Sequence, residues 1–378
     1  MNAPGAASAF ALRAALEEMV RRQASDLHLK VGRAPVLRVH GALTELPAPP
    51  LRPEDLRRVY EQLLSPTQRE EFERRRELDF AVGIPGLGRF RVNVFLQRGT
   101  LAFAVRAIMF EIPPLDQLHL PPVLREIVEA PRGLVLVTGV TGSGKSTTLA
   151  SMLRHLNETR AVNIVTIEDP IEFLFRDQRA IISQREVGSD TLSFHEALRH
   201  VLRQDPDVIM LGEIRDRETM EAALKAAHTG HLVLSTLHTI DAVHTLARIV
   251  SFFPPHQHEE IRQLVATSLR AIVSLRLIPR ADGRGRVPAV EVLRNTAAVA
   301  ELLRSGEGLH TLPDLLATGR PQYGTQTFDQ SLMDLYRAGL ISLEAALFHA
   351  SNPSEFALRA SGVEPASEAG WSGSEPSS

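Results

Sequence analysis

The chain has 378 residues, 44% hydrophobic and 23% charged, a composition typical of a globular protein with two or three domains. It contains no cysteine, which excludes disulfides and thiolate-bound metals. A net charge of −3 provides no general attraction to nucleic acid, so we expect no nucleic-acid partner.

Targeting patterns are missing from the sequence. No apolar run approaches the roughly 18 residues of a membrane span. The first segment, "MNAPGAASAFALRAALEEMVRRQ", lacks the basic stretch and solid apolar stretch of a signal peptide. We therefore expect a cytoplasmic protein whose contact with any membrane is indirect.

Residues 1–112 are predicted to form a mixed α/β domain. Apolar residues recur at helical spacing from about residue 8 to residue 23. Strands are predicted where apolar and polar residues alternate, in "SDLHLKVG", "PVLRVHG", "DFAVGI" and "GRFRVNVFLQRGTLAFAVRAI". The segment "RPEDLRRVYEQLL" between them is predicted to be a helix.

The pattern changes after a proline-rich segment, 113–122, which is predicted to be a linker. Four apolar runs then alternate with helical stretches: "GLVLVTG", "NIVTIED", "DVIMLGE" and "HLVLSTLH". This alternation is typical of a parallel sheet covered on both faces. We predict an α/β domain over 123–358, mostly helical after about residue 290, and a disordered tail over 359–378.

The segment "GVTGSGKS" matches the phosphate-binding pattern G-x-x-x-x-G-K-[ST]. Its glycines let backbone N–H groups approach phosphate oxygens, and the following helix adds its unpaired N-terminal donors. Lys145 is expected to reach the β- and γ-phosphates, and the Ser146 hydroxyl to bind Mg²⁺. The predicted nucleotide-binding residues are Gly139, Thr141, Gly142, Ser143, Gly144, Lys145, Ser146 and Thr147.

Two carboxylates follow predicted strands of the same sheet. Glu168 ends "NIVTIE", and Glu213 follows "VIMLG", where many nucleotide-hydrolysing enzymes have an aspartate. The carboxyl ends of strands in such sheets gather at the edge where ligands bind. Acids there order the metal's water shell and orient the attacking water, although either acid alone is also compatible with a solvated helix start.

The motifs "GVTGSGKSTT", "TIEDPIEF", "RQDPDVIMLGEIRD" and "TGHLVLSTLHT" stand in the order and approximate spacing of a known family. Over roughly residues 20 to 358 the chain resembles the secretion ATPases of type II secretion, type IV pilus and type IV secretion systems. The resemblance implies a RecA-like P-loop NTPase core, a smaller N-terminal PAS-like α+β domain and C-terminal helices. It also implies ATP and Mg²⁺ as ligands.

The resemblance assigns roles to individual residues. Glu213 lies in the family's atypical Walker B motif and would be the catalytic glutamate. Glu168 would be the Asp-box acid near metal and water, and the predicted metal ligands are Ser146 and Glu168. His231 and His238 would belong to the His box, with His238 the stronger candidate for sensing the γ-phosphate. Without the family, a histidine beside a strand is more often structural.

Two arginines match family positions that reach a neighbouring subunit's nucleotide. They are Arg91 and Arg106, and Arg89 is a neighbouring alternative. An arginine supplied to phosphoryl transfer contributes about 10³ to 10⁵ in rate. The other interpretation is that both are outward-facing strand residues.

The short, cysteine-free chain fits the pilus-retraction branch of the family better than the assembly branch, whose members usually carry a tetracysteine zinc module. The PilT-type C-terminal signature is absent, and the corresponding place reads "TAAVAELLRSGEG". Segments such as "IVSFFPPHQH" and "NPSEFALR" resemble the PilU type instead.

The resemblance therefore implies a homo-hexameric ATPase motor that drives type IV pilus retraction and twitching motility. Its expected place is the cytoplasm, peripheral to the inner membrane at the pilus base. An inner-membrane platform protein and a PilT-type paralogue are the expected partners. The alternatives are an accessory PilU-type ring subunit, a type II or type IV secretion or DNA-uptake ATPase, and a DNA-handling RecA-like motor.

Overall fold

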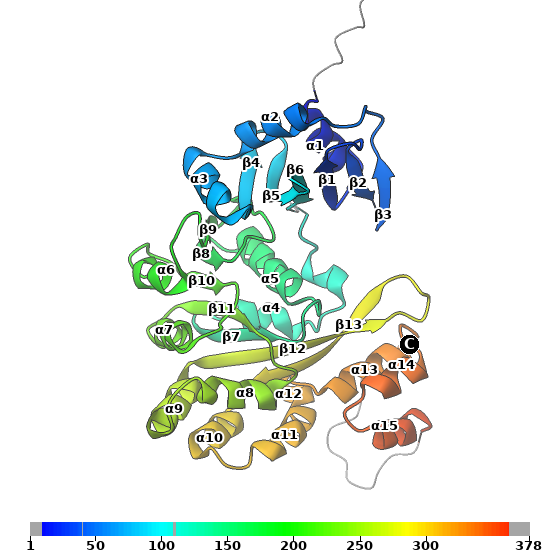
Figure 1. The fold of residues 1–378 in the computed structure, drawn as a ribbon. Coiled ribbons are helices and arrows are strands. Elements are labelled where there is room, and N and C mark those ends of the chain that lie inside the picture. The colour runs from blue at the N-terminus through cyan, green and yellow to red at the C-terminus, as the bar shows by residue number, and fades with distance from the viewer. Residues whose placement is uncertain (1–9, 40, 109–110, 363–378) are drawn as a thin grey trace, which may run out of the picture. The chain divides into compact units, whose positions relative to one another are not determined.

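The computed structural model describes residues 10–39, 41–108 and 111–362, and the chain divides into two compact units (Figure 1). Unit 1 comprises 1–110 with 172–174, and unit 2 comprises 111–171 with 175–378. The segment 113–122, predicted as a linker, belongs to unit 2. Its 3-10 helix η1 (Leu115–Leu118) places Leu115 in the same core cluster as Leu124, so this segment is packed.

The described residues of unit 1 form three helices and six strands. They are α1 (Leu12–Arg21), β1 (Asp26–Lys30), β2 (Val36–Val39), β3 (Ala42–Glu45), α2 (Pro53–Leu63), α3 (Pro66–Arg75), β4 (Glu77–Ile84), β5 (Gly88–Gln97) and β6 (Thr100–Ala107). The strands form one sheet in the order β3-β2-β1-β6-β5-β4, with antiparallel neighbours. Alternate residues of β5, among them Val92 and Val94, are buried in the core, as the sequence pattern predicts.

Unit 2 is built on a seven-stranded sheet in the order β13-β12-β7-β11-β10-β8-β9. Neighbouring strands are parallel except for the antiparallel pair β12–β13. The four strands predicted from the sequence are β7, β8, β10 and β11, and they form the middle of the sheet. The bounds are β7 (Gly133–Thr138), β8 (Asn163–Glu168), β9 (Ile181–Glu186), β10 (Val208–Leu211), β11 (Leu232–Leu237), β12 (Leu269–Pro279) and β13 (Arg286–Arg294).

Helices cover both faces of this sheet, which explains why its central strands are apolar throughout (Figure 1). Leu134 and Leu136 of β7 pack with residues of α6, α7 and α9, whereas Val135 and Val137 pack with α4 and α5. The helices are α4 (Val123–Val128), α5 (Lys145–Thr159), α6 (Phe194–Val201), α7 (Arg217–His228), α8 (Ala242–Ser251), η2 (Pro255–Gln257) and α9 (His258–Ser268).

The region after β13 is helical, as predicted. It comprises α10 (Ala297–Ser305), η3 (Leu309–Thr311), α11 (Leu312–Thr318), α12 (Arg320–Tyr323), α13 (Phe328–Arg337), α14 (Leu343–His349) and α15 (Pro353–Ala360). Phe328 and Phe356 bury their rings against Ile278 and Val287 of the β12–β13 pair. The predicted tail starts within α15, and its residues 363–378 lie outside the described residues. Among the described helices, none is long and apolar enough to cross a membrane.

Candidate active site

The loop between β7 and α5 has the geometry that its glycines predict. Gly139 has a φ of 143°, and a Cβ there would lie 2.5 Å from Ser143 Oγ and 2.6 Å from the Leu275 carbonyl oxygen. No side chain fits in that space without displacing the backbone. Gly144, with a φ of 96°, caps the N-terminus of α5 in the left-handed conformation. The sharp turn therefore aims the first N–H groups of α5 at the loop.

Polar side chains inside this loop are arranged to receive an anion. Lys145 is buried, and its Nζ donates to the carbonyls of Gly139 at 2.8 Å and Val140 at 3.0 Å. The Ser143 hydroxyl is also buried and has no hydrogen-bond partner among the described residues. A buried polar group without a partner is costly, so the loop fits an added phosphate. Ser146 and Thr147 occupy the first turn of α5, and Thr141 is exposed at the loop's tip.

Glu168 lies at the carboxyl end of β8 and is buried. Its Oε1 accepts hydrogen bonds from Thr166 Oγ1 at 2.6 Å and from Gln184 Nε2 at 3.1 Å. Thr166 is two residues earlier on β8, and Gln184 is on the adjacent strand β9. These donors provide hydrogen bonds that a buried carboxylate requires.

Gly212 explains the unusual end of β10. A Cβ built on Gly212 would lie 3.5 Å from Glu168 Cα and 3.8 Å from Asp169 N. An aspartate at this position would therefore add a second acidic side chain beside the backbone of Glu168, and like charges on neighbouring strand ends repel each other. Glycine avoids this repulsion.

Glu213 follows Gly212, and its side chain is 19% exposed. The Nε2 of His238, just beyond β11, lies 3.0 Å from Glu213 Oε2. Arg215 forms an ion pair with the other oxygen, Oε1. Burial, followed by the charges of Lys145 and Arg215, lowers the pKa of His238, although a carboxylate partner favours the charged form. His238 is therefore neutral at pH 7 and donates its Nε2–H to Glu213.

The parallel sheet brings these residues together at the carboxyl ends of its strands. Register pairs Leu211 at the end of β10 with Ile167 of β8 and with Ser235 of β11. Thr138 at the end of β7 pairs with Leu237 of β11. The phosphate-binding loop, Glu168, Glu213 and His238 all follow these strand ends, so they share the edge where such sheets bind ligands.

The other predicted residues lie elsewhere. His231 precedes β11 at the opposite edge of the sheet, and its Nδ1 lies 3.0 Å from the Ala226 carbonyl oxygen. Arg91 and Arg106 belong to unit 1, where they are direct partners across β5 and β6. Arg106 Nε donates to Asp26 Oδ1 at 2.9 Å, whereas Arg91 Nε is buried without a hydrogen-bond partner in the described structure. Arg89, the alternative, lies two residues before Arg91 on β5.

The donor set fits Mg²⁺ but not a metal held by protein side chains alone. Among the described residues no group of three or more His, Asp or Glu side chains could hold a metal ion. Mg²⁺ is usually bound through one or two carboxylates together with substrate phosphates and water. Ser146 and Glu168 are sufficient protein ligands for such a site.

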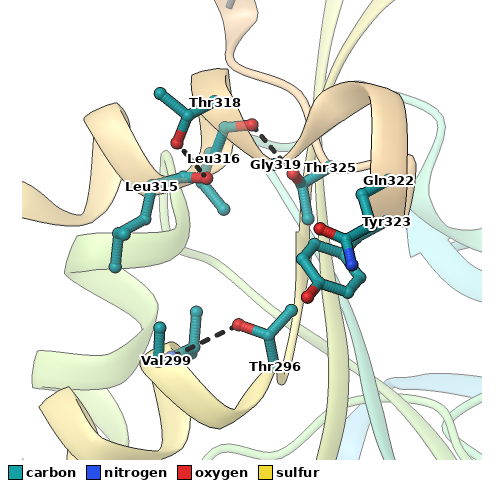
Figure 2. A pocket seen from close by; sticks show the side chains of 10 residues that line it. Thr296, Val299, Leu315, Leu316, Thr318, Gly319, Gln322, Tyr323 and Thr325 are labelled. Atoms are coloured by element: carbon teal, nitrogen blue, oxygen red, sulfur yellow. Dashed lines mark hydrogen bonds between the residues drawn. The ribbon is translucent and has the colours of Figure 1, made fainter. Parts of the chain in front are cut away.

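Two cavities in unit 2 have linings that do not suit phosphate. The smaller, of about 180 Å³, is shown in Figure 2. No charged side chain lines it, and the hydroxyls of Thr318 and Thr325 donate to backbone carbonyls. The larger, of about 640 Å³, is lined by five acidic and two basic residues, including buried Glu291 and half-buried Arg276. Its net negative lining would repel a nucleotide's phosphates.

Three residues of the site were not predicted from the sequence. Thr166 and Gln184 hold Glu168, and no local pattern signals them because Gln184 reaches Glu168 only through the pairing of β8 and β9. Arg215 lies inside "LGEIRD", two residues after Glu213. Alternation along an extended segment places residues two apart on the same side, so the sequence could have predicted that Arg215 lies near Glu213.

Comparisons with known proteins identify the family of the chain. A family model described as "Type II/IV secretion system protein" matches residues 6–308. The chain is 43% identical to "Type IV pilus ATPase PilU" of Pseudomonas aeruginosa, covering 91% of this chain and 89% of the relative. It is also 43% identical to that organism's "Type IV pilus retractation ATPase PilT", covering 89% and 97%. The crystal structure of the pilus retraction motor PilT with bound ADP matches with a TM-score of 0.84 and 44% identity, covering 92% and 98%.

Proposed function

Because the chain belongs to the type II/IV secretion system protein family, as its motifs predict, we propose that it is an ATPase motor of a type IV pilus. The observation that supports this proposal most directly is the shared sheet edge, where the phosphate-binding loop meets Glu168, Glu213 and His238. Two relatives with 43% identity carry the names of type IV pilus ATPases.

In this proposal the loop binds the phosphates of ATP. Lys145 exchanges its carbonyl partners for phosphate oxygens, and the Ser143 hydroxyl gains the partner that it lacks. The amides of residues 139–147 surround the phosphates. Ser146 and Glu168 would hold Mg²⁺, which when bound neutralises part of the negative charge that develops on the phosphates.

Glu213 orients the attacking water in this proposal. Its carboxylate accepts a hydrogen bond from the water, whose oxygen attacks the γ-phosphorus while the bond to the bridging oxygen of ADP breaks. The products are ADP and inorganic phosphate, and the water's proton passes to Glu213 or directly to phosphate. Neutral His238 holds Glu213 Oε2 and lies just beyond the end of β11, and we expect it to respond to the γ-phosphate.

We expect Arg91 and Arg106 to complete the nucleotide site of a neighbouring subunit in a homo-hexamer. Residues directly opposite each other in an antiparallel pair share one face of the sheet, so both guanidinium groups belong to the same surface of unit 1. The pair thus places two guanidinium groups on one surface, and Arg106 would exchange its partner Asp26 for a phosphate oxygen. Such charges stabilise a phosphoryl-transfer transition state.

In the cell, the ring would act at the cytoplasmic side of the inner membrane, on a platform protein, to retract the pilus. A second candidate role is that of an accessory subunit working with a PilT-type paralogue. The observation that favours it is the near-equal likeness to PilU and PilT, each 43% identical over most of the chain.

The test is steady-state phosphate release by the size-selected oligomer, with its mass measured by light scattering. We expect hydrolysis by the wild-type protein and by Lys225→Ala, which removes an exposed lysine paired with Glu221. Glu213→Gln should bind a fluorescent ADP normally but lower kcat by about 10² or more, and Lys145→Ala should lose binding. No hydrolysis by an intact wild-type ring would reject the independent motor, and the assay would then be repeated with a PilT-type partner.

A further inference from the structure

The carboxylate of Glu213 is held from two sides. His238 Nε2 lies 3.0 Å from Oε2, and Arg215 Nε pairs with Oε1. The Glu213 side chain is 19% exposed, whereas the Arg215 side chain is 64% exposed. The His238 side chain is 49% exposed, so both partners are accessible to solvent while the carboxylate that they hold is largely buried.

The backbone around Arg215 is fixed on both sides of it. Gly212 N donates to the Ile167 carbonyl at 2.8 Å, and Ile214 N donates to the Thr236 carbonyl at 3.1 Å. Asp216 caps α7 by accepting from Thr219 N at 2.8 Å. Ile214 is buried, so the alternation of an extended segment leaves Glu213 and Arg215 on the opposite, outer side.

We propose that Arg215 is a positioning residue for Glu213. A glutamate held at one oxygen can still rotate about that contact, whereas an ion pair at the other oxygen opposes that rotation. Arg215 supplies this ion pair from a backbone segment that is hydrogen-bonded on both sides of it. This inference rests on the proposed function, because the fixed plane matters only if Glu213 orients the attacking water.

Arg215 also acts on the histidine. Burial and then the charge of Lys145 lower the pKa of His238, and the charge of Arg215 adds a smaller contribution in the same direction. A neutral imidazole donates one hydrogen bond to Glu213 and leaves the carboxylate's negative charge in place. Arg215 thus supports Glu213 directly through the ion pair and indirectly by keeping its other partner neutral.

The test compares Arg215→Gln with Arg217→Gln as its control. The control also removes one arginine charge, but the Arg217 side chain donates to Gln257 and not to Glu213. We expect Arg215→Gln to lower kcat by about tenfold or more, with KM and ADP affinity within about twofold. Hydrogen exchange at the imidazole C2 position, followed by mass spectrometry, should show the pKa of His238 rising. Arg217→Gln should resemble the wild type in all three measurements.

Arg215→Lys separates charge from geometry. A lysine keeps the positive charge but lacks the rigid planar donor, so we expect the pKa of His238 to stay near its wild-type value while kcat is only partly restored. Arg215→Gln with wild-type kcat and an unchanged His238 pKa would overturn the inference. An inactive wild type would instead reject the proposed function, and the His238 measurement alone would then decide whether Arg215 holds this site.

Discussion

The carboxylates at the ends of β8 and β10 lie on neighbouring strands but in different surroundings. Glu168 is buried, and its Oε1 accepts hydrogen bonds from two neutral side chains. Glu213 is partly exposed, and its partners are a histidine and a surface arginine. A buried carboxylate with hydrogen-bonded support suits a metal ion, whereas a more exposed one suits a water molecule. We therefore propose that Glu168 serves the metal ion and Glu213 the attacking water, a division that the motifs alone left open.

The largest expected effect comes from separating these roles. Glu168→Gln should raise the Mg²⁺ concentration needed for half-maximal hydrolysis by about tenfold or more, because it removes the charged ligand. Glu213→Gln should lower kcat by about 10² or more and leave the Mg²⁺ requirement unchanged. Both are read from phosphate release over a Mg²⁺ titration. Equal Mg²⁺ dependence in the two variants would show that the two carboxylates do not have separate roles.

A second prediction concerns the glycine between the two acids. Gly212→Asp should lower kcat by about tenfold, because it adds a second negative charge beside the backbone of Glu168. Gly212→Ala is the control, since its Cβ would make an ordinary contact at 3.5 Å from Glu168 Cα. Turnover should stay within about twofold for the alanine variant. If both variants lose activity equally, backbone packing rather than charge requires the glycine.

A smaller effect is expected from the support of Glu168. Thr166→Val keeps the shape of the buried side chain but removes the hydroxyl that donates to Glu168 at 2.6 Å. We expect the Mg²⁺ requirement to rise by about three- to tenfold, at the low end of what lost outer-shell partners cost. Thr166→Ser keeps the hydroxyl and should resemble the wild type. Similar behaviour of the serine and valine variants would show that this hydrogen bond does not tune the site.

A third carboxylate, Glu291, extends the comparison to a site away from the strand ends. Burial raises its pKa to about 7, although the Ala242 N–H donates to it at 2.7 Å. The folded chain therefore binds more protons than the unfolded chain between about pH 4.5 and 7, and the free energy of unfolding falls as pH rises through that range.

Glu291→Gln should remove this loss. On going from pH 5 to pH 8, the free energy of unfolding of the variant should therefore rise relative to that of the wild type, by at most about 3 kcal/mol. Denaturant unfolding at both pH values measures the difference, and the exposed Glu301→Gln is the control. An unchanged pH dependence would show that Glu291 is not enclosed as the structure indicates. ATP hydrolysis should change little, because Glu291 is outside the proposed nucleotide site.

Much of the fold and part of the site could be predicted because their signals are local. The phosphate-binding loop is one continuous segment, and Gly139 and Gly144 are dictated by the positive φ values of that turn. The four central strands are apolar throughout because helices cover both faces. In contrast, β9 mixes exposed and buried residues at the sheet edge and was not predicted.

The choice between the two histidines shows where local signals end. His231 and His238 flank the same short strand, and the sequence places both in one motif. Because each residue of a strand advances about 3.3 Å, β11 separates them, with His231 at its amino end and His238 beyond its carboxyl end. Only His238 follows the carboxyl end and reaches Glu213.

The sequence by itself determined the family, the phosphate-binding loop and the two acids, because each depends on residues close together in the chain. Tertiary structure decided which acid is buried, which histidine reaches Glu213 and which side chains hold Glu168. The physical reason is the strand order β11-β10-β8-β9. It brings together segments that are distant in sequence, and burial and hydrogen bonding between such segments arise only when the sheet forms.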